Sequence, residues 1–230
     1  MTVVLGLDTA TAHTVVAVLA YGREPVELRH VPGPGERPGH ARELLPLAHR
    51  ALAQAGLGFA DVDRLGVGVG PGTFTGLRIG VATARALAQA GGAAPVPVST
   101  LRALATAAGH DGPVLAVLDA RRGEAFAAAY RGAEQLHEPV AVAPERLAAL
   151  AAGSPGTWLA IGDGAVRFRE HLEPAGLSVP PDSSLLHAVS AVATCRLAKD
   201  GDPVAVDALV PMYVRAPDAV PRPRRGIGEA

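Results

Sequence analysis

The amino-acid sequence predicts an α/β protein of two lobes, each a mixed sheet covered by helices. Three short apolar runs rich in β-branched residues precede a helical pattern, a fourth strand and a second helix. The first strand of this unit ends Leu5-Gly6-Leu7-Asp8, and Ala116-Val117-Leu118-Asp119 repeats that ending later in the chain. Two apolar strands that each end in aspartate before a hairpin indicate an internal duplication.

The length of the chain accommodates this organisation. With 230 residues, the protein is long enough for two lobes that each bury a core. We expect the first lobe over residues 1–105, and a second, reduced lobe with a C-terminal tail over residues 106–230.

The first lobe begins with three predicted strands, over residues 3–7, 14–20 and 26–31. Turn residues separate them, so an antiparallel meander is the simplest arrangement. A helix is predicted over residues 40–55, where leucine and alanine recur at helical spacing, and Gly56 ends it.

The rest of the first lobe follows the same reasoning. Pro46 is expected to kink the first helix or to lie in its first turn. A strand over residues 65–69, a glycine-proline turn, a helix over residues 76–89 and a short strand over residues 97–99 complete the lobe.

The second lobe continues from the repeated strand with further elements in order. They are a strand over residues 126–130, a helix near 144–152, a strand over 158–161, and helices near 165–172 and 185–199.

Composition and charge exclude several classes of protein. The formal net charge of -1 provides no general attraction for a polyanion, which disfavours unaided binding of nucleic acid. The single cysteine, Cys195, lies in an apolar helical stretch, which excludes a disulfide framework and fits a reducing compartment. The start of the chain lacks a basic region and carries Asp8 among apolar residues, so we expect a soluble cytoplasmic protein without membrane contact.

The glycine-rich run from Gly66 to Gly80 lies at a strand-to-helix junction, where nucleotide phosphates often bind. A P-loop needs a lysine directly before its Ser/Thr, but Lys199 is the only lysine in the chain. In the dinucleotide fingerprint the third glycine would fall on Thr73, and no acidic residue follows about 20 residues later. Neither nucleotide motif is therefore present.

Small residues recur every fourth position after this turn. Gly76, Gly80, Ala84 and Ala88 share one face of the predicted helix, so another helix could approach it closely. That helix could belong to a partner or to the chain itself.

Metal and peptidase chemistry lack their usual residue patterns. The eight histidines include no two that are three or four residues apart, so no helical histidine pair can ligate a metal. No Gly-x-Ser-x-Gly elbow occurs, and Cys195 lies in an apolar helical stretch, as expected for an inert core thiol. We expect no metal, no other cofactor and no peptidase activity.

Several longer motifs resemble one family. The duplicated lobes resemble the actin-like, or ribonuclease H-like, superfamily that includes sugar kinases and the Hsp70 ATPases. Within it, the chain is similar to the bacterial TsaB (YeaZ) family, a group of TsaD-like proteins. The motifs that carry this resemblance are Leu7-Asp8-Thr9-Ala10, His40-Ala41-Arg42-Glu43-Leu44-Leu45-Pro46, Gly70-Pro71-Gly72-Thr73-Phe74-Thr75-Gly76-Leu77-Arg78-Ile79-Gly80, Asp119-Ala120-Arg121-Arg122-Gly123-Glu124 and Pro211-Met212-Tyr213-Val214-Arg215.

The resemblance implies a non-catalytic dimerisation subunit of the machinery that makes N6-threonylcarbamoyladenosine (t6A37) in tRNA. Its partners would be the catalytic paralogue TsaD, as a heterodimer, and the ATPase TsaE, with tRNA reached only through the complex and a homodimer as one form of the isolated chain. The two long helices of the first lobe would dock the paralogue. The expected docking residues are Leu44, Leu45, Ala48, Gly76, Gly80, Ala84 and Ala88.

The superfamily also implies a phosphate-binding hairpin in each lobe, with glycine two residues after the aspartate. Here Asp8 is followed by Thr9 and Ala10, while Arg121 stands two residues after Asp119. Both hairpins are therefore expected to be vestigial. The alternative function is a small sugar or acyl kinase of the same superfamily, and an independent tRNA-binding module is disfavoured by the charge balance.

Overall fold

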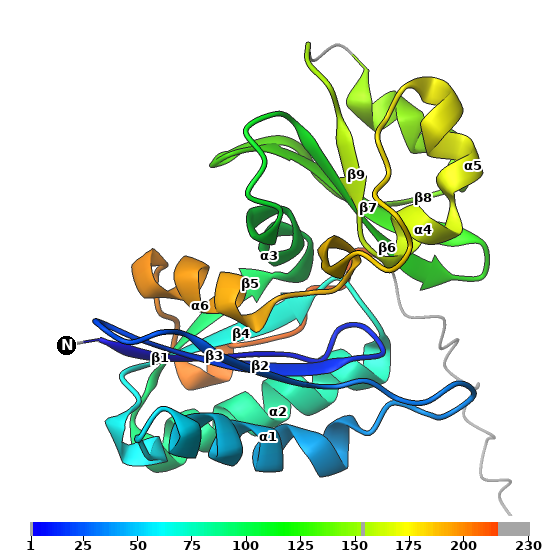
Figure 1. Ribbon diagram of the computed structural model, residues 1–230. Coiled ribbons are helices and arrows are strands. Elements are labelled where there is room, and N and C mark those ends of the chain that lie inside the picture. Colours follow the sequence, from blue (N-terminus) through cyan, green and yellow to red (C-terminus); the bar gives the residue numbers. More distant parts are fainter. Residues whose placement is uncertain (1, 153–154, 216–230) are drawn as a thin grey trace, which may run out of the picture.

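A computed structural model describes residues 2–152 and 155–215, and it contains two mixed sheets, one in each lobe (Figure 1). The first sheet has the order β3-β2-β1-β4-β5, with β1 and β4 parallel at its centre. Its first three strands form the predicted antiparallel meander. The strands of this sheet are β1 Val3–Asp8, β2 Thr14–Ala20, β3 Val26–His30, β4 Arg64–Gly70 and β5 Ala94–Ser99.

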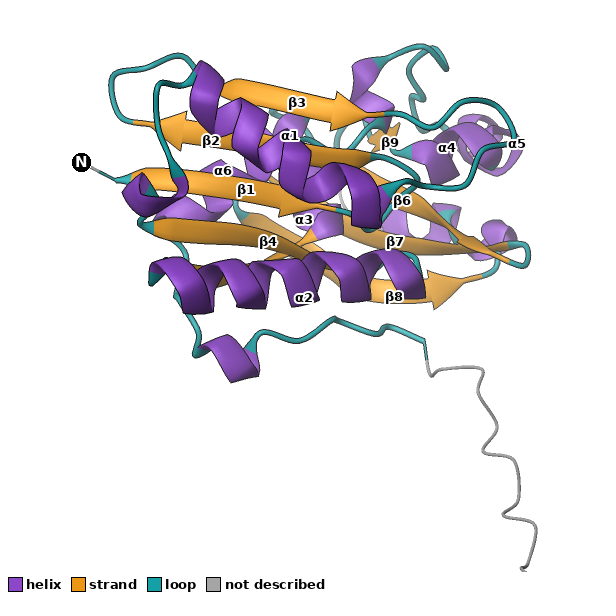
Figure 2. Ribbon diagram, turned by 90° about the horizontal axis from the view of Figure 1, so that it is seen from below, coloured by secondary structure: helices purple, strands orange, loops and turns teal. Residues whose placement is uncertain are grey.

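Helices cover both faces of the first sheet. The helices α1 His40–Gln54 and α2 Phe74–Gly91 lie side by side on one face (Figure 2), and α6 Ala191–Asp200 covers the other (Figure 1). The central strands are buried on both faces, because alternate residues of β1 enter the two cores. Burial on both faces explains why these strands read as continuous apolar runs.

The second lobe repeats this plan on a smaller scale. Its sheet has the order β8-β7-β6-β9, with strands β6 Val114–Arg121, β7 Glu124–Arg131, β8 Glu134–Val142 and β9 Leu159–Ile161. The short helices α4 Asp163–Arg167 and α5 Arg169–Leu172 pack on one face of it. The helix α3 Thr100–Ala107 packs on the other face and lies between the lobes (Figure 1).

The end of the described chain returns to the first lobe, which corrects the expected assignment of residues 106–230 to the second. Cys195 and its neighbours in α6 pack against Val4 and Ala17 of the first sheet. Farther on, Leu209 is buried in the core beneath α1 and α2, and the Met212 N–H donates to the Val69 carbonyl. Arg215 then reaches the second lobe, where it pairs with Glu124. The predicted C-terminal tail beyond residue 215 lies outside the described residues.

Several predicted elements differ from the structure. The helix expected over residues 185–199 begins only at Ala191, because Ser190 caps it, and a 3-10 turn Leu185–His187 precedes it. The helix expected near 144–152 is a pair of 3-10 turns, Pro144–Arg146 and Ala148–Ala151. Of the two expectations for Pro46, a place in the first turn is wrong, because Pro46 lies inside α1 beyond that turn.

Short 3-10 turns complete the fold at Phe59–Asp61, Glu173–Ala175 and Val206–Ala208. Over the described ranges, no helix has the length and apolar character needed to cross a bilayer.

Candidate functional site

The turn after β1 is built around a buried carboxylate. Asp8 is only 1% exposed, and its Oδ1 accepts the Ala10 N–H at 2.7 Å while its Oδ2 accepts the Thr100 hydroxyl at 2.8 Å. A side chain at Gly68 would overlap this carboxylate, so the β4 glycine makes room for it. Desolvation raises the pKa of Asp8 to about 6. Both carboxylate oxygens are thus engaged by groups of the chain itself.

The start of α2 packs directly on this turn. The Thr9 hydroxyl donates to the Gly76 carbonyl at 2.7 Å, and the Thr73 N–H donates to the Ala10 carbonyl at 2.7 Å. A methyl group at Gly76 would overlap the Thr9 carbonyl oxygen, and one at Gly80 would overlap the Thr9 hydroxyl. Gly76 and Gly80 therefore allow α2 to approach the β1–β2 turn closely.

The expected docking residues, which were to form or directly support the docking face, differ in exposure. Six of the seven expected docking residues are buried inside the first lobe, so they make no surface of their own: Leu44, Ala48, Gly76, Gly80, Ala84 and Ala88. Leu45 is 48% exposed on the outer side of α1. The buried residues can support a docking face, and Leu45 can belong to one.

The turn after β6 is held by ion pairs. The Asp119 carboxylate accepts the Arg121 N–H at 2.8 Å and contacts the guanidinium groups of Arg121 at 3.3 Å and Arg167 at 3.0 Å. The Asp119 N–H in turn donates to Asp163 at 3.0 Å. Arg121 has a positive φ of 64°. Arg121, which stands where the superfamily implies glycine, therefore pairs with Asp119 of its own hairpin.

Histidine and cysteine side chains serve structural contacts. The His40 ring, at the start of α1, is buried with its Nδ1 2.8 Å from the Thr14 hydroxyl oxygen, and desolvation lowers its pKa. The Cys195 thiol is buried against the carbonyl oxygens of Val4 and Ala17, and burial raises its pKa to about 12. In the described part of the chain, no three His, Cys, Asp or Glu side chains are grouped to hold a metal ion.

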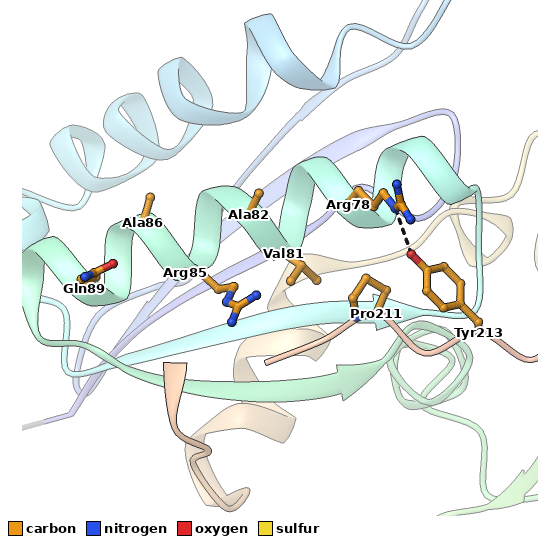
Figure 3. A pocket seen from close by; sticks show the side chains of 8 residues that line it. All are labelled: Arg78, Val81, Ala82, Arg85, Ala86, Gln89, Pro211 and Tyr213. Carbon is orange, nitrogen blue, oxygen red and sulfur yellow. Dashed lines mark hydrogen bonds between the residues drawn. The ribbon is translucent and has the colours of Figure 1, made fainter. Parts of the chain in front are cut away.

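A surface cluster that the sequence analysis did not assign lies where α2 meets the C-terminal segment. The exposed rings of Phe74 and Tyr213 stack with centroids 5.6 Å apart, and the Arg78 guanidinium lies 3.8 Å from the centre of the Phe74 ring. The Arg78 Nε also donates to the Tyr213 hydroxyl at 3.2 Å (Figure 3). Arg78 and Tyr213 both lie in motifs that carry the family resemblance. They are 135 residues apart in the sequence, so only the tertiary fold brings them into contact.

Comparison with known proteins matches this arrangement to one family. The profile of the TsaD family, described as tRNA N6-adenosine threonylcarbamoyltransferase, matches residues 36–192. No curated protein matches the chain in sequence.

Solved structures agree with the family match. YeaZ from Pseudomonas aeruginosa is 30% identical, with 93% of this chain and 100% of that chain covered and a TM-score of 0.78. A second structure, described as an uncharacterized protein with similarity to peptidase YEAZ from Pseudomonas aeruginosa, is 29% identical, with 94% and 100% covered and a TM-score of 0.78.

A more distant structure is similar in fold alone. The ethanolamine utilization protein EutJ from Carboxydothermus hydrogenoformans is 15% identical, with 83% of this chain and 89% of that chain covered and a TM-score of 0.50. The predicted family resemblance and the predicted actin-like fold are both confirmed. The chain therefore belongs to the TsaD family of tRNA N6-adenosine threonylcarbamoyltransferases, as one of its YeaZ-like (TsaB-like) members.

Proposed function

We propose that this protein is a non-catalytic dimerisation subunit of the complex that makes N6-threonylcarbamoyladenosine in tRNA. It would pair with the catalytic TsaD paralogue, act together with the ATPase TsaE, and reach tRNA only through that complex in the cytoplasm. The observation that carries this proposal is the state of Asp8, whose carboxylate is buried and hydrogen-bonded on both oxygens. A carboxylate held in this way supports the turn rather than a ligand.

The neighbouring backbone supports the same conclusion. Phosphate-binding hairpins present free N–H groups to the anion. In the β1–β2 turn, the Ala10 N–H is bonded to Asp8, and the Thr9 hydroxyl is bonded to Gly76. In the β6–β7 turn, the Arg121 N–H is bonded to Asp119. These donors would have to break internal bonds before they could hold a phosphate.

A first test addresses nucleotide binding by the isolated protein. Because these hairpin donors are engaged, titration of the chain with Mg-ATP in a calorimeter should give no dissociation constant in the low-micromolar range. Micromolar binding, or steady ATP hydrolysis by the chain alone, would instead favour the kinase-type alternative.

The outer side of α1 and α2 is the proposed docking face. The two helices lie side by side and cover the face of the sheet opposite α6 (Figures 1 and 2). Leu45 of α1 and Phe74 of α2 are both large apolar side chains with substantial exposure. An exposed pair of helices with apolar side chains is a suitable surface for a second helix pair.

A second test uses this face. Leu45→Arg would place a charge in an apolar contact, so we expect binding of the TsaD paralogue to weaken about tenfold or more. Leu185→Arg is the matched control, because Leu185 is 78% exposed on the other lobe. Both variants should stay folded. The affinity of each for the separately purified paralogue can be measured by calorimetry.

If Leu45→Arg binds the paralogue as tightly as the unmodified chain, the docking face lies elsewhere. If the unmodified chain forms no complex with the paralogue, the proposed function itself is wrong. Light scattering of the chain alone, over a range of concentrations, would show whether it also forms a homodimer.

A further inference from the structure

A groove runs along the protein surface between α2 and the C-terminal segment, with a volume of about 610 Å³ (Figure 3). Apolar groups from Val81, Ala82, Ala86 and Pro211 form part of its lining. Among residues 2–152 and 155–215, no acidic side chain lines it, whereas two arginines of α2 do. The groove therefore combines an apolar surface with a local positive charge in a protein whose formal net charge is -1.

The first of these arginines, Arg78, is held in place by aromatic groups. Its guanidinium lies over the Phe74 ring, and its Nε donates to the Tyr213 hydroxyl. Neither of its terminal nitrogens has a hydrogen-bond partner among residues 2–152 and 155–215. The group is thus oriented before any ligand arrives, which lowers the entropy cost of forming a new ion pair.

The second arginine, Arg85, is oriented by the backbone of the C-terminal segment. Its Nε donates to the Val206 carbonyl at 2.9 Å and its Nη2 to the Asp207 carbonyl at 2.8 Å. Carbonyl oxygens orient the guanidinium but leave its charge unpaired, and Nη1 has no partner in the described part of the chain. Figure 3 shows Arg85 directed from α2 toward Pro211.

We infer that this groove binds an acidic segment of a protein partner, with carboxylates on Arg78 and Arg85 and small apolar side chains against the alanines and Pro211. Oriented guanidinium groups suit carboxylates, and exposed alanines one helical turn apart allow a segment to approach closely. A nucleic acid would require a longer basic track, whereas Arg78 and Arg85 are the only basic side chains that residues 2–152 and 155–215 contribute to the lining. The inference rests on the proposed function in one respect, since the partner probed is the TsaD paralogue.

Charge reversal tests the inference in the complete complex. Arg78→Glu and Arg85→Glu should each weaken binding of the purified paralogue about tenfold or more, and binding by the unmodified chain should weaken as salt concentration rises. Arg196→Glu is the matched control, because Arg196 is exposed on α6, on the opposite side of the sheet. It should bind like the unmodified chain, and thermal unfolding should show that all three variants are folded.

A cross-linking variant tests which group occupies the groove. Lys199 is the only lysine of the chain and lies on α6, so Arg78→Lys adds a single amine at the groove while keeping the charge. With a zero-length carbodiimide, this variant should become linked through position 78 to an aspartate or glutamate of the paralogue. Mass spectrometry of the digested product would identify that residue, and the unmodified chain should not give the same product.

Several outcomes would overturn the inference. Unchanged paralogue affinity in both charge-reversal variants, with Leu45→Arg still weakening the complex, would reject the groove and leave the docking face intact. Equal weakening by Arg196→Glu would show a general charge effect. Binding of a short RNA to the unmodified chain that is lost on charge reversal would assign the groove to nucleic acid. Failure of the unmodified pair to form would reject both proposals.

Discussion

Replacing Gly76 by alanine is expected to lower the free energy of unfolding by about 3 kcal/mol. The added methyl group would overlap the Thr9 carbonyl oxygen and would lie 2.6 Å from the Thr73 hydroxyl oxygen. One of these contacts is backbone and cannot rotate away, so α2 would have to move off the β1–β2 turn. Urea denaturation followed by circular dichroism would measure the loss.

The matched control lies in the same helix. At Gly91, the last residue of α2, an added methyl group would meet only the Phe59 carbonyl oxygen at 3.7 Å. Because alanine favours the helix more than glycine does, Gly91→Ala should raise the free energy of unfolding by about 0.5 to 1 kcal/mol. Equal effects at the two positions would show that helix propensity, and not close packing on the turn, determines the result.

Replacing Asp8 by asparagine is expected to stabilise the protein at pH 7.5 by about 1 to 2 kcal/mol. A pKa raised from 3.8 to about 6 in the folded state corresponds to about 3 kcal/mol of unfavourable free energy for the ionised side chain. Asparagine removes that charge and can keep the hydrogen bond from the Ala10 N–H. Its amide requires the Thr100 hydroxyl to accept instead of donate, which costs part of the gain.

The raised pKa of Asp8 determines how the free energy of unfolding changes with pH. Between pH 3.8 and about 6 the unfolded state releases the Asp8 proton first, so the folded state holds more protons and stability falls as the pH rises. The advantage of Asp8→Asn should therefore vanish below about pH 4. Asp111→Asn, at an exposed position, should change stability by less than about 0.5 kcal/mol at any pH. Urea denaturation at several pH values would compare the three proteins.

The first lobe was predictable because its elements carry strong local signals. The β-branched runs of β1 and β2 predict strands, and the spacing of Leu44, Leu52 and their neighbours predicts α1. In the second lobe the signals are weaker. The local sequence does not predict α3, although Ser99 caps it, or β8, where charged residues and Pro139 interrupt the pattern of a half-buried strand.

The candidate site was predictable only in part. The four-residue spacing of Gly76, Gly80, Ala84 and Ala88 correctly identifies a face that something approaches closely. At Gly76 and Gly80 the approaching group is the Thr9 turn, more than 60 residues earlier in the chain, and periodicity within one helix carries no information about such a partner. The Asp8–Thr100 hydrogen bond and the Arg78–Tyr213 contact are likewise set by the tertiary fold.

The return of α6 to the first sheet has a consequence for how the protein is made. All five strands of that sheet have been synthesised by Ser99, but the face formed by Val4, Ala17 and Val98 is not fully covered until α6 follows about a hundred residues later. The second sheet, by contrast, draws its strands and the helices α3, α4 and α5 that cover it from one continuous stretch. On the ribosome, the lobe that begins first is therefore completed last, and its apolar face is open to chaperones in the meantime.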